Sequence, residues 1–289
     1  PTTEATEPPT GWQELNGNRY YLFPDGTHPT GWFEDEGEVY YIAPNGFMHT
    51  GWLELPERIA ATELEKIKAA AAKIRSDSQV LVVDAGDAVQ GTTYFNLYKG
   101  EAEQRVMNEL GYDLRIVGNH EFDNGVDTLA AALQNAKFDV VCANYDVTGS
   151  ALEGIVKPYT ILRRANLRIG VFGIGLDPKG LVADRNFAPL QYLNPIETAQ
   201  KTADILKNKK KCDVVICLSH QGTHPGMDGR ISDIEMAKAT QNIDIIIGAH
   251  THKIVENLYI PNLNGDSVLL MQTGKAGARI GKIMLEMQE

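Results

Sequence analysis

Short runs of apolar and β-branched residues recur along most of the chain, and several of them end in residues that bind metals. Runs of this kind occupy residues 79–84, 113–118, 213–219 and 244–248. Because they are apolar on both faces, they are typical of parallel strands buried in an α/β sheet. Further strands are predicted over residues 139–144, 168–174, 267–272 and 280–286, and helices over residues 61–74, 101–110, 126–136, 195–209 and 232–241. This alternation predicts a layered α/β domain.

The first 60 residues follow a different pattern, a repeat of 20 residues. Thr-Gly-Trp occurs at residues 10–12, 30–32 and 50–52, and a Tyr-Tyr pair lies at residues 20–21 and 40–41. Asn-Gly or Glu-Gly turns separate the apolar runs of the units, which predicts a β-hairpin for each. Since one hairpin cannot bury its own apolar face, successive hairpins must stack. We therefore divide the chain into a linker (1–9), a small all-β array of hairpin repeats (10–56) and an α/β domain (57–289).

Charge and composition argue against two kinds of partner. The net charge of the 289 residues is -11, and the longest basic run is Lys209 to Lys211, so nucleic-acid binding is not expected. No stretch approaches the roughly 20 apolar residues of a membrane span. The three cysteines lack CxxC spacing, and we interpret them as small buried hydrophobic residues: Cys142, Cys212 and Cys217.

Metal-binding residue types cluster at the ends of four predicted strands. The motifs are Gly86-Asp87, Gly118-Asn119-His120-Glu121, Ser219-His220 and Gly248-Ala249-His250-Thr251-His252. Because ligands of α/β sheets bind beyond the carboxyl ends of the strands, we expect one shared site. Oxygen and nitrogen donors together suit Zn, Mn, Fe or Co better than Ca. A single buried His is usually a hydrogen-bonded core residue, but four of the seven His residues at these strand ends favour a metal site.

The four motifs, in this order, resemble those of the calcineurin-like metallophosphoesterases, specifically the 5′-nucleotidase branch. The resemblance covers roughly residues 60–289. It implies a layered β-sheet sandwich with flanking helices and a pair of divalent transition-metal ions. The implied ligands are Asn119, His220 and His250 for one ion and His252 for the other, with Asp87 bridging both. His250 and His252, one residue apart, would share a face in extended chain.

The resemblance gives His120 a role beside the metals. It would contact the phosphoryl oxygens or the leaving group and be oriented by Asp123, three residues later. The implied reaction is metal-dependent hydrolysis of phosphate esters, most simply 5′-nucleotides or related nucleotide esters. A metal-activated hydroxide would attack phosphorus in line, and the imidazolium of His120 would assist the departing oxygen.

One motif of the family is missing. The family begins with a strand that ends in Asp-x-His and binds the first metal, and no such motif precedes Asp87. One metal therefore keeps four ligands and is well supported, whereas its neighbour keeps only Asp87 and His252. Two hypotheses follow. In the first, a segment of the array or another chain replaces the missing strand; direct pairing of the two strands that flank it would contradict this. In the second, the chain is a catalytically impaired surface-binding module. The retained ligands favour the hydrolase.

The repeat units resemble those of choline-binding and glucan-binding proteins of Gram-positive cell surfaces. In that family, aromatic rings of neighbouring hairpins form a cage for a quaternary ammonium group. The corresponding residues are Trp12, Trp32, Trp52, Tyr21 and Tyr41, and the ligand would be choline or a cell-wall glycan. The choline binders usually carry another aromatic residue before the Tyr pair, where this chain has Arg19 and Val39, so a purely structural role for the aromatic residues stays open. Both resemblances imply an extracellular or cell-surface bacterial protein.

Overall fold

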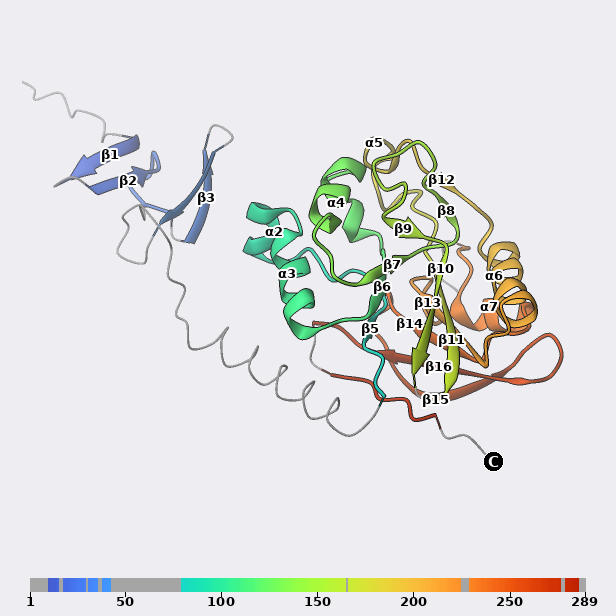
Figure 1. Ribbon diagram of the computed structural model, residues 1–289. Helices are drawn as coiled ribbons and strands as arrows, with labels where there is room; N and C mark the ends of the chain where they lie inside the picture. Colours follow the sequence, from blue (N-terminus) through green and yellow to red (C-terminus); the bar gives the residue numbers. More distant parts are fainter. Residues whose placement is uncertain are drawn as a thin grey trace, which may run out of the picture. The chain divides into compact units, whose positions relative to one another are not determined.

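The computed structural model describes residues 10–15, 18–29, 31–35, 38–42, 79–164, 166–224, 229–276 and 279–285 (Figure 1). The chain divides into two compact units, residues 1–67 and 68–289. No helix in the described ranges is long and apolar enough to cross a bilayer.

The described residues of the first unit form two β-hairpins, as the 20-residue repeat predicts. β1 (Gly11–Leu15) pairs with β2 (Asn18–Leu22), and β3 (Gly31–Asp35) pairs with β4 (Glu38–Ile42). The registers match, because Trp12 lies opposite Tyr21 and Trp32 lies opposite Tyr41. Residues directly opposite each other in an antiparallel pair share a face, so the first hairpin places Trp12 and Tyr21 on one side. The third motif, residues 50–52, lies outside the described residues.

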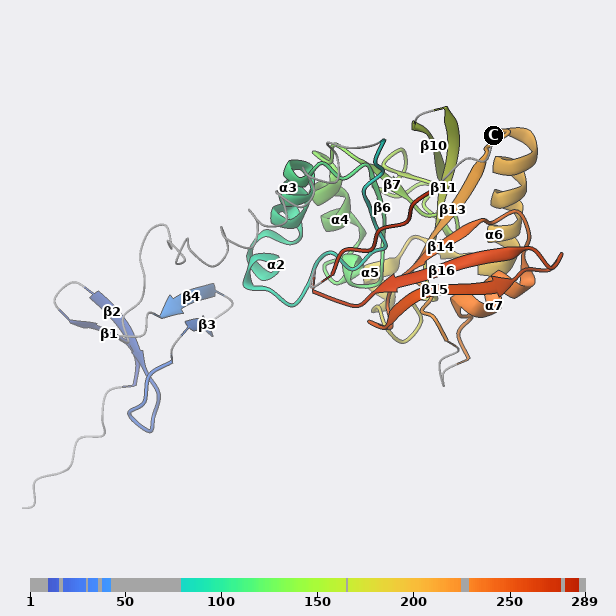
Figure 2. The same ribbon diagram turned by 90° about the horizontal axis from the view of Figure 1, so that it is seen from below.

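Two larger sheets and one short strand pair lie in the described part of the second unit (Figure 2). The first sheet is parallel and has the order β5 (Val83–Asp84), β6 (Leu114–Ile116), β7 (Asp139–Val141) and β9 (Val156–Lys157). The second has the order β10 (Tyr159–Arg164), β11 (Leu167–Ile174), β13 (Val214–Ser219), β14 (Ile245–Gly248), β16 (Ser267–Thr273) and β15 (Ile254–Pro261). Its four inner strands are parallel, and the two edge strands are antiparallel to them. A separate short pair joins β8 (Tyr145–Asp146) and β12 (Gln191–Tyr192).

Helices flank both sheets. The helical segments are α2 (Thr93–Tyr98), α3 (Glu101–Leu110), η1 (His120–Phe122), α4 (Val126–Leu133), α5 (Asp184–Phe187), α6 (Pro195–Asp204), the π-helical turn η2 (Ile205–Lys209) and α7 (Asp233–Ala239). Local sequence explains where two of them begin. The Asn194 side chain accepts hydrogen bonds from the first turn of α6, which starts with a proline, and Ser232 and Glu235 form a capping box on α7.

The apolar core consists of two layers, which confirms the predicted sandwich. One layer lies between the two sheets and extends to helices α3 and α4, and the other lies between the six-stranded sheet and helices α6 and α7. Along β13, Ile216 and Leu218 belong to the first layer, and Val215 and Cys217 belong to the second. A strand buried on both faces therefore needs the continuous apolar run seen in the sequence. All three cysteines are buried and free, as predicted.

Several predicted elements differ from the structure. Helix α2 and strands β10 and β15 were not predicted, and the predicted helix over residues 61–74 lies outside the described residues. Residues 280–285 form no strand; apart from Ile283 their side chains are exposed, and they pair with none of the described strands. In the described part of the chain, β5 pairs only with β6. The hypothesis that another segment replaces the missing strand would be contradicted if the two strands beside the gap paired directly, and the described residues show no such pairing.

Candidate metal centre

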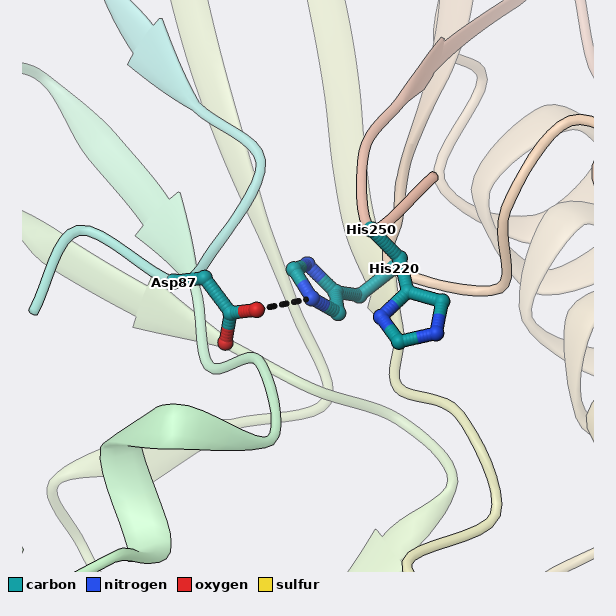
Figure 3. A group of neighbouring side chains, drawn as sticks. All are labelled: Asp87, His220 and His250. Atoms are coloured by element: carbon teal, nitrogen blue, oxygen red, sulfur yellow. Dashed lines mark ion pairs between the residues drawn. The ribbon is translucent and has the colours of Figure 1, made fainter. Parts of the chain in front are cut away.

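The carboxyl ends of strands from both sheets bring the predicted ligands together. Asp87 follows β5, His220 follows β13, and His250 follows β14. One ligand atom from each of these residues lies within 4.8 Å of the others, and the described residues form no second group of this kind (Figure 3). Residues far apart in the sequence therefore meet at one point, as the strand-end pattern predicts.

Asp87 and His220 define the geometry of this centre. The Nε2 atom of His220 lies 2.9 Å from Oδ2 of Asp87 (Figure 3). Its Nδ1 atom lies 2.7 Å from the carbonyl oxygen of Ala85, and since a carbonyl can only accept, Nδ1 carries a proton. In the neutral ring, Nε2 then turns its lone pair toward the carboxylate. It is buried without a properly oriented hydrogen bond among the described residues, and a divalent cation fits this arrangement of donors.

The charges of Asp87 and His250 agree with a cation site, and His220 interacts with the same carboxylate. Burial alone would raise the pKa of Asp87, but His220 and the backbone N–H of His120 lower that pKa to about 2. Burial would lower the pKa of His220, but the Asp87 carboxylate outweighs it and raises that pKa. Burial and the nearby His220 lower the pKa of His250 to about 4. His250 is therefore a neutral imidazole at neutral pH, the form that binds metals.

Asn119 is the fourth predicted ligand of the same ion. Its side chain is buried, and Oδ1 finds no hydrogen-bond partner among the described residues. A buried amide oxygen without a partner is unfavourable unless something else binds it, and a cation beside Asp87 would do so. The next residue, His120, donates its backbone N–H to Oδ1 of Asp87 at 2.8 Å, which holds Asn119 beside the carboxylate.

Glycines allow the loops to approach one another this closely. A Cβ atom at Gly86, where φ is +94°, would lie 2.7 Å from Nδ1 of His220 and 2.9 Å from the backbone nitrogen of Gly118. A Cβ atom at Gly118 would lie 2.8 Å from Cε1 of His220. Both glycines of the Gly-Asp and Gly-Asn-His motifs are therefore required by the packing of the centre.

His120 and Asp123 form the predicted pair beside the centre. Nδ1 of His120 lies 2.9 Å from Oδ2 of Asp123, and 41% of the His120 side chain is exposed. Asn186 donates a hydrogen bond from its side chain to the Asp123 carbonyl oxygen at 2.8 Å. The carboxylate orients the imidazole while leaving it accessible from solvent.

Other predicted site residues lie outside this cluster. His252 is exposed and is not part of the group of three. Its backbone φ is 54°, and that of His250 is 66°, so this segment is not the extended chain on which the expectation of a shared face depended.

In the repeats, Trp12 packs edge-to-face on Tyr21 with ring centroids 5.4 Å apart. The indole of Trp12 donates to Oδ2 of Asp35 at 3.0 Å, and the Arg19 guanidinium lies over its ring, 4.6 Å from the centroid. The side chains of Trp32 and Tyr41 are not described, and Trp52 lies outside the described residues.

Three buried charged residues near the centre were not predicted from the sequence. Arg115 and Glu121 form an ion pair with fully buried side chains, and Asp233 is also fully buried. Ser219, which precedes the predicted ligand His220, donates a hydrogen bond to Oδ1 of Asp233 at 2.5 Å. The sequence holds one indication of them, an arginine inside the apolar run 114–117. A charged side chain in a buried strand needs a buried partner.

An α/β sandwich with oxygen and nitrogen donors at the carboxyl ends of its strands is the arrangement of a metallohydrolase. Residues 48–254 match the calcineurin-like phosphoesterases, and the chain belongs to this family. Residues 10–27 and 30–48 match a cell wall binding repeat of the choline-binding type. Both resemblances noted in the sequence are confirmed.

Known proteins of the 5′-nucleotidase type are similar to this chain. The trifunctional nucleotide phosphoesterase YfkN of Bacillus subtilis is 27% identical over 80% of this chain and 17% of its own length. The snake venom 5′-nucleotidase of Naja atra is 34% identical over 66% of this chain and 34% of its own length. The crystal structure of the 5′-nucleotidase precursor from Thermus thermophilus has a TM-score of 0.63 at 30% identity, over 71% of this chain and 42% of that one. This chain thus spans less than half of these relatives.

Proposed function

We propose that this chain hydrolyses phosphate esters in a metal-dependent reaction and that its substrates are 5′-nucleotides or related nucleotide esters. The observation that carries the proposal is the convergence of Asp87, His220 and His250 at the carboxyl ends of three strands. Relatives named as 5′-nucleotidases support the substrate class. The alternative, an impaired surface-binding module, has no support from the relatives.

The chain offers a complete set of donors for one divalent ion. Asp87, Asn119, His220 and His250 would hold it, and their mixture of oxygen and nitrogen suits Zn, Mn, Fe or Co. Asp87 and His252 are the residues proposed for a second ion. An ion bound here supplies positive charge to the phosphoryl oxygens and makes water a stronger nucleophile.

His120 is the residue proposed to act on the substrate. Its Nδ1 atom is engaged by Asp123, which leaves the other ring nitrogen to meet a phosphoryl oxygen or to protonate the leaving oxygen. The partial exposure of the ring allows a substrate to reach it. His220 has a different task, because the Ala85 carbonyl holds the proton on Nδ1 and keeps Nε2 directed at the centre.

The repeat array is proposed to attach the enzyme to a bacterial cell wall. Residues 10–56 would bind choline or a cell-wall glycan, with residues 1–9 as a linker and residues 57–289 as the catalytic domain. The match to a cell wall binding repeat supports this arrangement and an extracellular or cell-surface location.

Metal content and hydrolysis of AMP test the proposal together. We would measure bound Zn or Mn by elemental analysis, and AMP hydrolysis with each added metal, in wild type, Asp87→Ala and the control Asp146→Ala, whose carboxylate is exposed on β8. We expect metal binding and turnover in wild type and the control, both lost in Asp87→Ala. About two ions per chain would mean that further ligands complete the second site. Turnover no higher than that of Asp87→Ala would contradict the proposal.

A further inference from the structure

Arg115 is a charged residue in the middle of a buried strand. It lies on β6 between Leu114 and Ile116, and all three side chains are 0% exposed. Moving an unpaired guanidinium from water to such a position is very unfavourable, so its partners must explain its presence.

One of those partners, Glu121, lies next to the metal centre. The Nη2 atom of Arg115 forms an ion pair with Oε1 of Glu121, whose side chain is also 0% exposed. Its Nη1 atom donates to Oε1 of Gln104 at 3.2 Å, and Nε lies 3.6 Å from Oδ1 of Asp84. Glu121 directly follows His120, the proposed catalytic histidine. The ion pair therefore connects the buried interior of β6 to the site.

Glu121 in turn joins the two loops that carry ligands. Its Oε2 atom accepts the backbone N–H of Asp87 at 3.0 Å and that of Gly118 at 2.6 Å. Its Oε1 atom accepts the backbone N–H of Ala88 at 3.1 Å. One buried carboxylate therefore binds the loop after β5 and the loop after β6 at the same time.

We propose that the Arg115–Glu121 ion pair is a positioning device that sets the distance between Asp87 and Asn119 and thereby the affinity of the centre for a divalent cation. The inference rests on the proposed metal-binding function. Arg115 holds the Glu121 carboxylate in place, and the carboxylate holds the backbone of both loops. Replacing outer partners of metal ligands typically weakens metal binding by roughly 10- to 100-fold.

A second arginine–carboxylate pair at the opposite end of the same strands provides a matched control. Arg164 Nη2 lies 2.5 Å from Oδ1 of Asp113, the residue that precedes β6. Asp113 accepts the backbone N–H of Val82 at 2.8 Å, and Arg164 donates to the Val80 carbonyl at 2.9 Å. The Arg164–Asp113 pair also forms hydrogen bonds between partly buried charged side chains and the backbone. None of these bonds involves the loops after β5 and β6 that carry the proposed ligands.

The test compares the two pairs in the full chain by calorimetric titration with Mn²⁺, by the visible absorption spectrum of bound Co²⁺ and by thermal unfolding. The variants are Glu121→Gln, the double variant Arg115→Met with Glu121→Gln, and the control Asp113→Asn. We expect a 10- to 100-fold weaker Mn²⁺ affinity and an altered Co²⁺ spectrum in the first two, and wild-type values in Asp113→Asn. In Glu121→Gln, an amide N–H₂ would face backbone N–H groups that need an acceptor.

The double variant separates positioning from folding. Removing both charges of a buried pair often leaves stability unchanged, whereas removing one partner is strongly destabilising. We therefore expect the double variant to regain thermal stability but not Mn²⁺ affinity. Wild-type affinity and a wild-type Co²⁺ spectrum in both variants would overturn the positioning role alone. A wild-type chain that binds neither ion would overturn the proposed metal-binding function as well.

Discussion

Gly118 faces the Asp87 carboxylate with no space for a side chain between them. A Cβ atom at position 118 would overlap Oδ1 of Asp87 and would lie 2.8 Å from the Asp87 backbone nitrogen. It would also lie 2.8 Å from Cε1 of His220. The loop after β6 can therefore approach both Asp87 and His220, which follow strands of different sheets, only if residue 118 is a glycine.

Gly118→Ala should weaken metal binding by at least about tenfold, because the methyl group must push Asp87 away from His220. The control is Gly170→Ala on β11, where a Cβ atom would meet Sγ of Cys212 at 2.9 Å and the Leu206 side chain, away from the centre. Both variants should lose about 1–3 kcal/mol of stability by overpacking. Titration with Mn²⁺ separates them, and equal affinities in the two variants would contradict this account of the glycine.

The pair His120–Asp123 should affect turnover and leave metal binding intact. Asp123→Asn removes the charge that orients the imidazole through the 2.9 Å contact, and we expect kcat for AMP to decrease by about 10- to 100-fold. His120→Ala should lose about 10²- to 10⁴-fold. The control is Asp127→Asn, an exposed carboxylate in the first turn of α4. Metal content in all three variants should equal that of wild type, and loss of bound metal in Asp123→Asn would show that the pair supports the centre itself.

Asp233 should make stability depend on pH. It is fully buried, Oδ2 has no hydrogen-bond partner among the described residues, and burial raises its pKa from 3.8 to about 7 against the opposing effects of Ser219 and His220. Between these two pKa values the unfolded chain has lost the proton that the folded chain keeps. Folding therefore becomes less favourable as the pH rises through this window, and the effect is complete above about pH 7.

Asp233→Asn removes this pH dependence because an amide does not titrate. We expect the free energy of unfolding of the variant to gain about 3 kcal/mol relative to wild type between about pH 5 and pH 8. The measurement is urea unfolding at several pH values in the presence of a chelator, so that metal binding does not contribute. Parallel curves for the two proteins would mean that Asp233 keeps an ordinary pKa in the folded state.

Long periodic segments were predicted well, because their apolar positions are repeated many times. The helix predicted over residues 101–110 is found as Glu101–Leu110, and the apolar run 213–219 contains β13 (Val214–Ser219). Strands at the sheet edges were missed, as were β10 and β15, or predicted too long, as was β5. Of the run 79–84, only Val83–Asp84 forms a strand. A strand needs a hydrogen-bonded neighbour along its whole length, and the sequence does not show how far the neighbouring strand extends.

The site was predictable where it depends on strand ends and unpredictable where it depends on what lies beneath them. Asp87, His220 and His250 were placed together because carboxyl ends of parallel strands converge. The link from Arg115 to Glu121 forms only when η1 turns the chain back beneath the loop after β5. His252 depended on the assumption of extended backbone, which positive φ angles at both histidines exclude.

Choline binding by the repeats should be limited by Arg19. Its guanidinium lies over the Trp12 ring, 4.6 Å from the centroid, in the position that a quaternary ammonium group would need. A ligand must displace this cation, which is attracted to the ring by about 0.5–1 kcal/mol at an exposed site. Arg19→Gln should therefore bind choline roughly two- to fivefold more tightly than wild type.

Retention of the full chain on immobilised choline measures this effect, with Glu14→Gln, directly opposite Arg19 in the hairpin, as the control. Weaker retention of Arg19→Gln would mean that Arg19 itself contacts the ligand, as expected if the array binds an anionic glycan.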